Sequence, residues 1–99
     1  MKKISVQLAK SLREIKEAES IEGFNIDSSY SGRGMYGKTC LGLSFDYLGD
    51  AFQLILMMES PELAKEVTEF FSDCSRDSMG RGVIFYGWDY TWPEEVSLN

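Results

Sequence analysis

The chain has 99 residues, of which 43% are hydrophobic and 13% aromatic, and its formal net charge at pH 7 is −6. This length fits a single domain spanning 1–99 and excludes two full hydrophobic cores, while the apolar content is that of a folded chain. The sequence contains no histidine, which removes the usual general base and the commonest metal ligand and excludes a Ser-His or Cys-His nucleophile. We therefore expect a protein that is not an enzyme and that holds neither a metal ion nor a cofactor.

The charges are unevenly distributed along the chain. Residues 1–58 carry seven acidic and seven basic side chains, whereas residues 59–99 carry nine acidic and three basic ones. An acidic half repels nucleic-acid phosphates and attracts a basic protein surface. We therefore expect a basic protein or complex as the partner, and no direct binding of nucleic acid.

Two features of the sequence indicate the compartment. The longest apolar run, residues 54–58, is far too short to cross a bilayer, and the N-terminus lacks the apolar stretch of a secretion signal. Cys40 and Cys74 match neither a disulfide framework nor a zinc pattern, so we expect buried free thiols. The sequence thus predicts a cytoplasmic protein without membrane association, and it leaves a homo-oligomer open.

The first half of the chain predicts one helix and two strands. An amphipathic helix comes first, because apolar side chains recur at steps of four, four and three residues: Ile4, Leu8, Leu12 and Ile15. This helix is expected to end before Gly23. Alternation of apolar and polar residues then predicts a short strand over about 24–30 and a longer strand over 39–47.

The second half completes the predicted fold. Residues 51–58 are apolar on both faces of a strand, which predicts a central strand. Ser60 and Pro61 are typical of the N-cap and first turn of a helix, which continues to about 73–76 and precedes a last strand over about 83–89. The order α-β-β-β-α-β predicts an α+β fold, with one antiparallel sheet of about four strands and two helices packed on one face.

The tripeptide Gly-Arg-Gly occurs twice, at 32–34 and 80–82, each time after Asp-Ser and before Tyr-Gly. Glycine amides can form an anion-binding nest, and arginine adds a planar fork for phosphate or carboxylate. One hypothesis is therefore a module that binds or sequesters a nucleotide or another anion where the two loops meet. Its binding residues would be Gly32, Arg33, Gly34, Tyr36, Gly80, Arg81, Gly82 and Tyr86.

The same tripeptides also fit two ordinary turns. Glycine allows a positive φ at a loop-to-strand connection, and each arginine can neutralise the aspartate that precedes it. Neither segment matches the phosphate-loop pattern or the dinucleotide-binding fingerprint. The sequence favours turns over a ligand site.

Residues 30–42, Tyr-Ser-Gly-Arg-Gly-Met-Tyr-Gly-Lys-Thr-Cys-Leu-Gly, resemble a segment of small phage and mobile-element proteins that carry Gly-Arg-Gly-Met-Tyr-Gly-x-x-Cys. The similar segment covers about 13 of the 99 residues and carries no catalytic residues. The resemblance implies that the gene lies in a phage or another mobile element. A small acidic cytosolic protein from such a source is often a non-catalytic inhibitor of a host system.

Four carboxylates of the second predicted helix share one face, which we call the acidic stripe: Glu62, Glu66, Glu69 and Asp73. Their spacing approaches that of a phosphate backbone, and Trp92 offers an aromatic anchor near other acidic residues. The simpler interpretation of the stripe is the solvated face of a surface helix. We favour a small non-catalytic acidic binding protein, a phage-type inhibitor whose acidic face occupies a basic, nucleic-acid-handling surface of a host complex.

Overall fold

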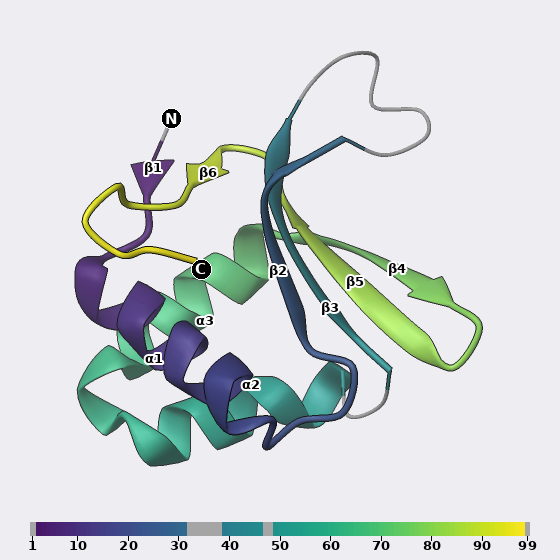
Figure 1. Cartoon of the computed structure of the whole chain (residues 1–99), viewed down its shortest axis with the longest axis horizontal. Helices are drawn as coiled ribbons and strands as arrows, with labels where there is room; N and C mark the ends of the chain where they lie inside the picture. The colour runs from purple at the N-terminus through teal and green to yellow at the C-terminus, as the bar shows by residue number, and fades with distance from the viewer. Residues whose placement is uncertain (1, 32–38, 47–48, 99) are drawn as a thin grey trace.

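The computed structural model describes residues 2–31, 39–46 and 49–98. Within these residues the chain has the predicted α+β fold, in which helices pack against a four-stranded antiparallel sheet (Figure 1). The elements in chain order are β1 (Lys2–Lys3), α1 (Val6–Ala18), β2 (Asn25–Tyr30), β3 (Cys40–Phe45), α2 (Gly49–Glu59), the 3-10 turn η1 (Pro61–Leu63), α3 (Ala64–Asp73), β4 (Ser75–Met79), β5 (Gly82–Gly87) and β6 (Tyr90–Thr91).

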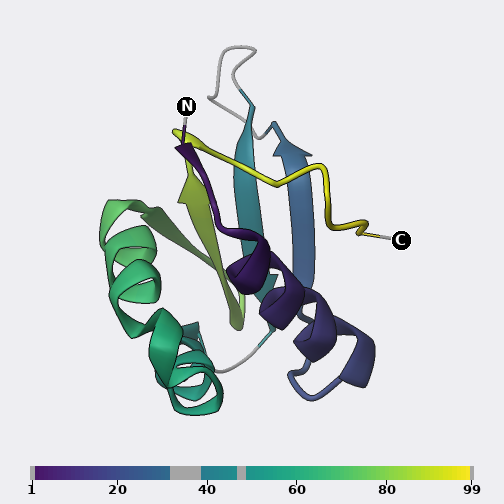
Figure 2. The same ribbon diagram turned by 90° about the vertical axis from the view of Figure 1, so that its left-hand side faces the viewer.

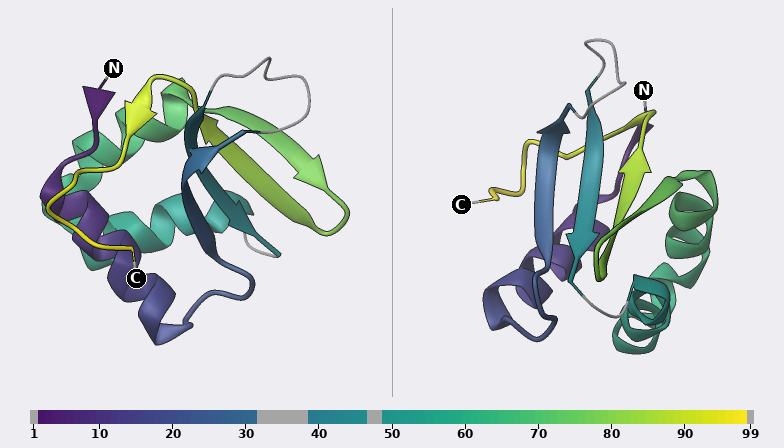
Figure 3. Two further views of the ribbon diagram at one scale, coloured as in Figure 1. Left: turned by 45° about the horizontal axis from the view of Figure 1, so that its top comes forward. Right: turned by 90° about the vertical axis from the view of Figure 1, so that its right-hand side faces the viewer.

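The four-stranded sheet has the order β2-β3-β5-β4, and all neighbouring strands are antiparallel. In its middle, Leu43 of β3 lies opposite Ile26 of β2 and Phe85 of β5. Strands β1 and β6 form a separate parallel pair that joins the two ends of the chain. Helices α1, α2 and α3 lie on one side of the sheet (Figures 2 and 3). We call the other side the open face, because no described helix lies over it.

Helix α1 confirms the first predicted helix. Ser5 is its N-cap, and the Ser5 Oγ accepts a hydrogen bond from the backbone N–H of Leu8 at 3.0 Å. The helix ends at Ala18, and Glu19 takes a left-handed φ of 50° as the C-cap. The predicted apolar stripe is buried, so the helix is held by the face that its sequence marks as apolar: Ile4, Leu8, Leu12 and Ile15.

Helix α2 corrects the strand that we predicted over 51–58. Phe52 and Leu56, four residues apart, are buried, whereas Leu54 and Met58, also four apart, are 63% and 79% exposed. Burial therefore follows the helical period, since a strand would place these four side chains on one face. The prediction was wrong because nearly every residue in the segment is apolar, so that periods of 2 and of 3.6 fit it equally well.

The sheet takes its fourth strand from a segment that the sequence prediction missed. Strand β4 forms a hairpin with β5 at the edge of the sheet, and its residues from 75 to 78 are exposed. Its sequence Ser-Arg-Asp-Ser-Met shows no apolar alternation, because neither face of this edge strand is buried. The sheet of about four strands is thus confirmed, but a third helix lies where the central strand was expected.

The helix predicted from Ser60 onward is present as η1 followed by α3. Its inward side carries Leu63, Val67 and Phe70, which are buried, and Cys74, which is half-buried. Ser60 occupies the N-cap position without a capping hydrogen bond from its side chain. Its Oγ instead lies 3.3 Å from the Ser11 Oγ of α1.

Aromatic rings join the helix layer to the sheet. The ring centroid of Phe45 in β3 lies 4.4 Å from that of Phe52 in α2 and 5.0 Å from that of Phe24, which precedes β2. Phe71 of α3 meets Phe85 of β5 edge to face at 4.9 Å. Helices α2 and α3 are therefore both anchored on the sheet through phenylalanines.

Candidate functional site

Glu66, in the middle of the acidic stripe, binds the start of α1. Its carboxylate accepts a hydrogen bond from the backbone N–H of Ser5 at 2.8 Å and another from the Ser5 Oγ at 2.5 Å. A carboxylate is stabilising at a helix N-terminus, where the backbone N–H groups carry partial positive charge. Glu66 is half-buried, and it connects α3 to the start of α1 through a residue 61 positions away in the sequence.

Asp73, the last member of the stripe, binds the two ends of the chain. Its Oδ2 accepts a hydrogen bond from the Tyr90 hydroxyl at 2.6 Å and lies 3.7 Å from the Lys2 Nζ. The hydrogen bond to Asp73, together with burial, raises the pKa of Tyr90 to about 12. Asp73 therefore joins α3 to the small β1-β6 pair.

Glu62 and Glu69 differ from these two carboxylates. Both side chains are exposed, and within the described residues neither makes a hydrogen bond or an ion pair. Seven residues at 1.5 Å each separate them by roughly 10 Å along the axis of a helix. The acidic stripe thus contains two residues that hold the fold and two that are available to a partner.

Trp92, the predicted aromatic anchor, belongs to the fold. Its indole Nε1 donates a hydrogen bond to the Val96 carbonyl oxygen at 2.6 Å, and its half-buried ring packs against the core. The hydrogen bond closes the C-terminal segment onto the protein. Trp92 therefore presents only part of its ring to the surface.

The second Gly-Arg-Gly forms the β4-β5 turn, and each of its glycines has a structural reason. Gly80 has a φ of +56°, which favours glycine. A Cβ on Gly82 would overlap the carbonyl oxygen of Phe45, because β5 passes close to the end of β3. The turn interpretation therefore accounts for both glycines without a ligand.

The first Gly-Arg-Gly, with Gly32, Arg33, Gly34 and Tyr36, lies outside the described residues. Its described neighbours Ser31 and Thr39 adjoin the end of the sheet where Leu41 pairs with Gly87. Gly80, Arg81 and Gly82 lie at the opposite end, where Phe45 pairs with Val83. The described residues thus do not bring the two predicted loops together.

Tyr86 lies in a row of aromatic side chains on the open face. Its ring centroid is 5.5 Å from that of Tyr30 in β2 and 6.1 Å from that of Trp88. Gly42 of β3 lies between the two tyrosines, and a Cβ there would come within 3.1 Å of the Tyr30 Cβ. Burial, with a hydrogen bond to Tyr30 and the charges of neighbouring groups, raises the pKa of Tyr86 to about 12. Tyr86 is therefore part of a packed row and lies at the far end of β5 from Arg81.

The outward side of α2 carries a surface that sequence reasoning missed. Leu54 and Met58 are the large apolar side chains that are well exposed among the described residues. Their spacing of four was visible in the sequence, but the predicted strand placed both of them in the core. A helical interpretation of 51–58 would have left one apolar side without a covering element.

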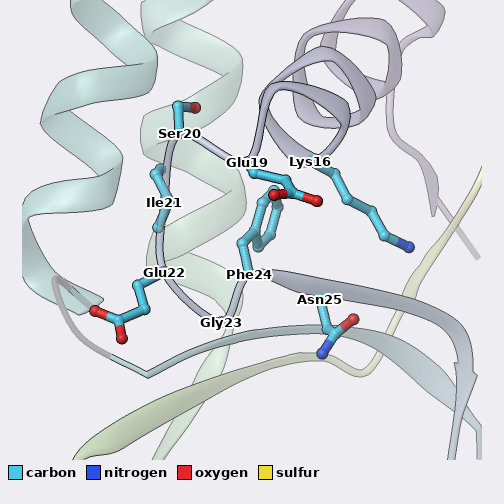
Figure 4. A pocket seen from close by; sticks show the side chains of 8 residues that line it. All are labelled: Lys16, Glu19, Ser20, Ile21, Glu22, Gly23, Phe24 and Asn25. Carbon is cyan, nitrogen blue, oxygen red and sulfur yellow. The ribbon is translucent and has the colours of Figure 1, made fainter.

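A pocket of about 520 Å³ lies beyond the C-terminal end of α1 and opens to solvent (Figure 4). Its charged lining consists of Lys16, Glu19 and Glu22, all at the surface. Gly23, with a φ of +67°, passes so close to Asp46 that a Cβ would overlap the Asp46 carboxylate. The Ser20 hydroxyl in the pocket lining donates a hydrogen bond to the Ile15 carbonyl oxygen at 3.4 Å.

The described residues offer no metal centre, since they contain no group of three or more potential Cys, Asp or Glu ligands. Both cysteines are free thiols. Burial raises the pKa of Cys40, and burial together with Asp73 raises the pKa of Cys74 to about 12, so neither is a thiolate at neutral pH. Every helix in the described ranges is too short or too polar to span a membrane.

Comparison with known proteins assigns the chain to no family. No protein-family model matches the chain, and neither the curated proteins nor the solved structures contain a match to it.

Proposed function

We propose that this chain is a small non-catalytic binding protein whose acidic helix layer engages a basic surface of a partner protein. One observation carries the proposal: Glu62 and Glu69 are exposed and make no bond with the described residues, in a half of the chain that holds all of the net charge. Carboxylates with no role in the fold are available to bind lysine and arginine side chains.

The proposed mode of action is occupancy of the partner surface. Exposed charge pairs each contribute only about 0.2–1 kcal/mol, but they steer association and align the two surfaces. In the finer form of the proposal, the partner surface normally handles nucleic acid and the chain acts as a phage-type inhibitor. This form has its support in the acidic net charge and in the resemblance of residues 30–42.

The binding test uses a synthetic 20-residue peptide of lysine, arginine, glycine and serine as a flexible basic probe. We expect binding that weakens between 50 and 200 mM salt, and a roughly tenfold higher Kd for Glu62→Lys/Glu69→Lys, from two pairs at the upper end of the range for exposed pairs. Duplex DNA of 20 base pairs should compete with the protein for this probe.

The matched control is Glu14→Lys/Glu22→Lys, which makes the same change in net charge at two exposed positions outside the stripe. This variant should bind the probe with a Kd within about threefold of that of the unchanged protein, because the substitutions alter the electrostatic potential only at a distance from Glu62 and Glu69. Equal losses in the two double variants would contradict the proposal, since net charge alone would then explain the binding.

A further inference from the structure

Helix α2 presents an apolar stripe to solvent. Its buried side carries Phe52 and Leu56, and the opposite side carries Leu54 and Met58, which are 63% and 79% exposed. Half-buried Ala51 and Ile55 extend this side. The positions 51, 54, 55 and 58 follow the i, i+3, i+4, i+7 spacing by which one helix packs against another. We call these four residues the α2 stripe.

Leu54 and Met58 of the α2 stripe lie outside the hydrophobic core of the described residues. The core contacts of α2 are made from its other side, through the rings of Phe52 and Phe45 and through buried Leu56. Two large apolar side chains exposed side by side on one helix are what a protein-binding surface shows in the absence of its partner. Met58 adds an unbranched side chain that adapts to an apolar partner, whereas Met57 packs against the core.

The charges around the stripe favour a basic partner. Helix α2 and η1 contain Asp50, Glu59 and Glu62 and neither lysine nor arginine. Glu59 and Glu62 are exposed and follow the stripe in the sequence, so a docked segment meets acidic residues beyond Met58.

The same charges disfavour a second copy of this chain as the occupant. A second copy would bring its own acidic α2 and η1 against those of the first. Each copy also carries a net charge of −6. A segment with positive charge avoids both repulsions.

We propose that the α2 stripe is a docking surface for an amphipathic helix of the partner protein, whose apolar stripe is flanked by lysine or arginine. This proposal rests on the proposed function and names the part of the basic partner that is bound. Leu54 and Met58 take up the apolar side of the docked helix, and the acidic residues of α2 and η1 fix its orientation.

The test uses an 18-residue amphipathic peptide of leucine and lysine, with a scrambled peptide of the same composition as its control. We expect backbone amide resonances of residues 51–59 to shift on titration with the amphipathic peptide. Leu54→Gln/Met58→Gln should raise its Kd at least tenfold, and Met58→Glu alone should do so as a second variant at the most exposed position. The matched control, Thr68→Gln/Ser72→Gln, changes two exposed residues at the same spacing on α3 and should bind within twofold.

Three results would overturn the proposal. Shifts confined to other elements, or equal binding by the Leu54→Gln/Met58→Gln protein, would remove the α2 stripe as the site. A dimer that light scattering detects and that this double variant abolishes would make a second copy the occupant. If Glu62→Lys/Glu69→Lys still weakens the flexible basic probe in these cases, the acidic binding function survives and only the docking surface fails.

Discussion

Helices α2 and α3 follow each other in the chain and pack against the same side of the sheet, but their outward faces have different uses. The charged face of α3 is tied into the fold, because Glu66 binds the start of α1 and Asp73 binds Tyr90. The outward face of α2 is apolar and makes no such link through Leu54 or Met58. In this protein, a row of charges is a weaker sign of a binding surface than exposed apolar residues that the fold does not explain.

This contrast also divides the acidic stripe. Its four carboxylates share one helical face in the sequence, but two of them bind other parts of the same chain. The exposed carboxylates of the stripe are therefore Glu62 and Glu69, and Glu62 lies three residues after the end of α2. A partner that contacts η1 also lies close to the α2 stripe along the chain, which couples the two proposals.

The largest expected change in stability comes from comparing substitutions on the buried and the exposed side of α2. Leu56→Ala removes a fully buried side chain and should lower the free energy of unfolding by about 2–5 kcal/mol. Leu54→Ala, two residues earlier on the side of the same helix that faces solvent, should change it by less than about 0.5 kcal/mol. Urea denaturation of both variants measures the difference. Similar losses would mean that the outward side of α2 is packed, and the contrast between the outward faces of α2 and α3 would be wrong.

The next largest expected loss of stability comes from breaking the contact between α3 and α1. Glu66→Gln keeps the shape of the side chain but removes the charge that accepts two hydrogen bonds from Ser5, so we expect a loss of about 1–3 kcal/mol. The matched change Glu69→Gln, on the same helix, should stay within about 0.5 kcal/mol. A double-mutant cycle of Glu66→Gln with Ser5→Ala isolates the pair. Because Ser5→Ala keeps the backbone N–H, purely additive effects in that cycle would show that the bond from the Ser5 Oγ does not stabilise the protein.

A smaller effect depends on pH and concerns Asp73. The pKa of Tyr90 is raised in the folded protein to about 12, above its ordinary value of 10, so the folded state favours the protonated hydroxyl. The stability from this contact is fully present below pH 10 and is lost as the pH rises from 10 to about 12. Asp73→Asn weakens the hydrogen bond that raises this pKa and removes the adjacent charge, so it should reduce the alkaline loss.

Unfolding free energies between pH 9 and 12 measure this effect. Tyr86→Phe is a useful background, because the pKa of Tyr86 is also raised to about 12 and would add its own loss over the same range. The same alkaline slope with aspartate and with asparagine at position 73 would show that Asp73 does not hold the Tyr90 hydroxyl.

The sequence predicted those elements whose burial follows one clear period. Leu8, Leu12 and Ile15 predict α1, and the alternation of Leu41, Leu43 and Phe45 predicts β3, because each set faces one core. The segment 51–58 carries apolar residues on every side, so the sequence alone could not tell α2 from a central strand. Strand β4 escaped prediction for the opposite reason, since its polar residues are exposed at an edge.

The candidate site was predictable only in part. Helical spacing placed the acidic stripe on one face, but no spacing shows that Glu66 meets Ser5 across 61 residues. That contact depends on how α1 and α3 pack on the sheet, which is a property of the tertiary structure. The turn at Gly80 was predictable because a positive φ is a local requirement, whereas the need for glycine at position 82 comes from the distant Phe45 carbonyl.

The smallest expected change in the free energy of unfolding concerns Glu69, and it is a gain in stability instead of a loss. Glu69 lies three residues after Glu66 and four before Asp73, towards the negative C-terminal end of α3. Like charges at this spacing and a carboxylate near a helix C-terminus are both unfavourable, so Glu69→Lys should stabilise the protein by about 0.5 kcal/mol at low salt. Salt at 0.5 M should reduce this gain, since the side chain is exposed.

Denaturation of Glu69→Lys at the two salt concentrations gives the sign. A loss of stability above about 0.5 kcal/mol would assign Glu69 to the fold, as with Glu66, and leave Glu62 alone as the free carboxylate of the stripe. A gain that coincides with weaker binding of the basic probe means that glutamate at this position serves binding at the expense of stability. That combination separates a residue kept for a partner from one kept for the fold, and it needs no knowledge of the natural partner.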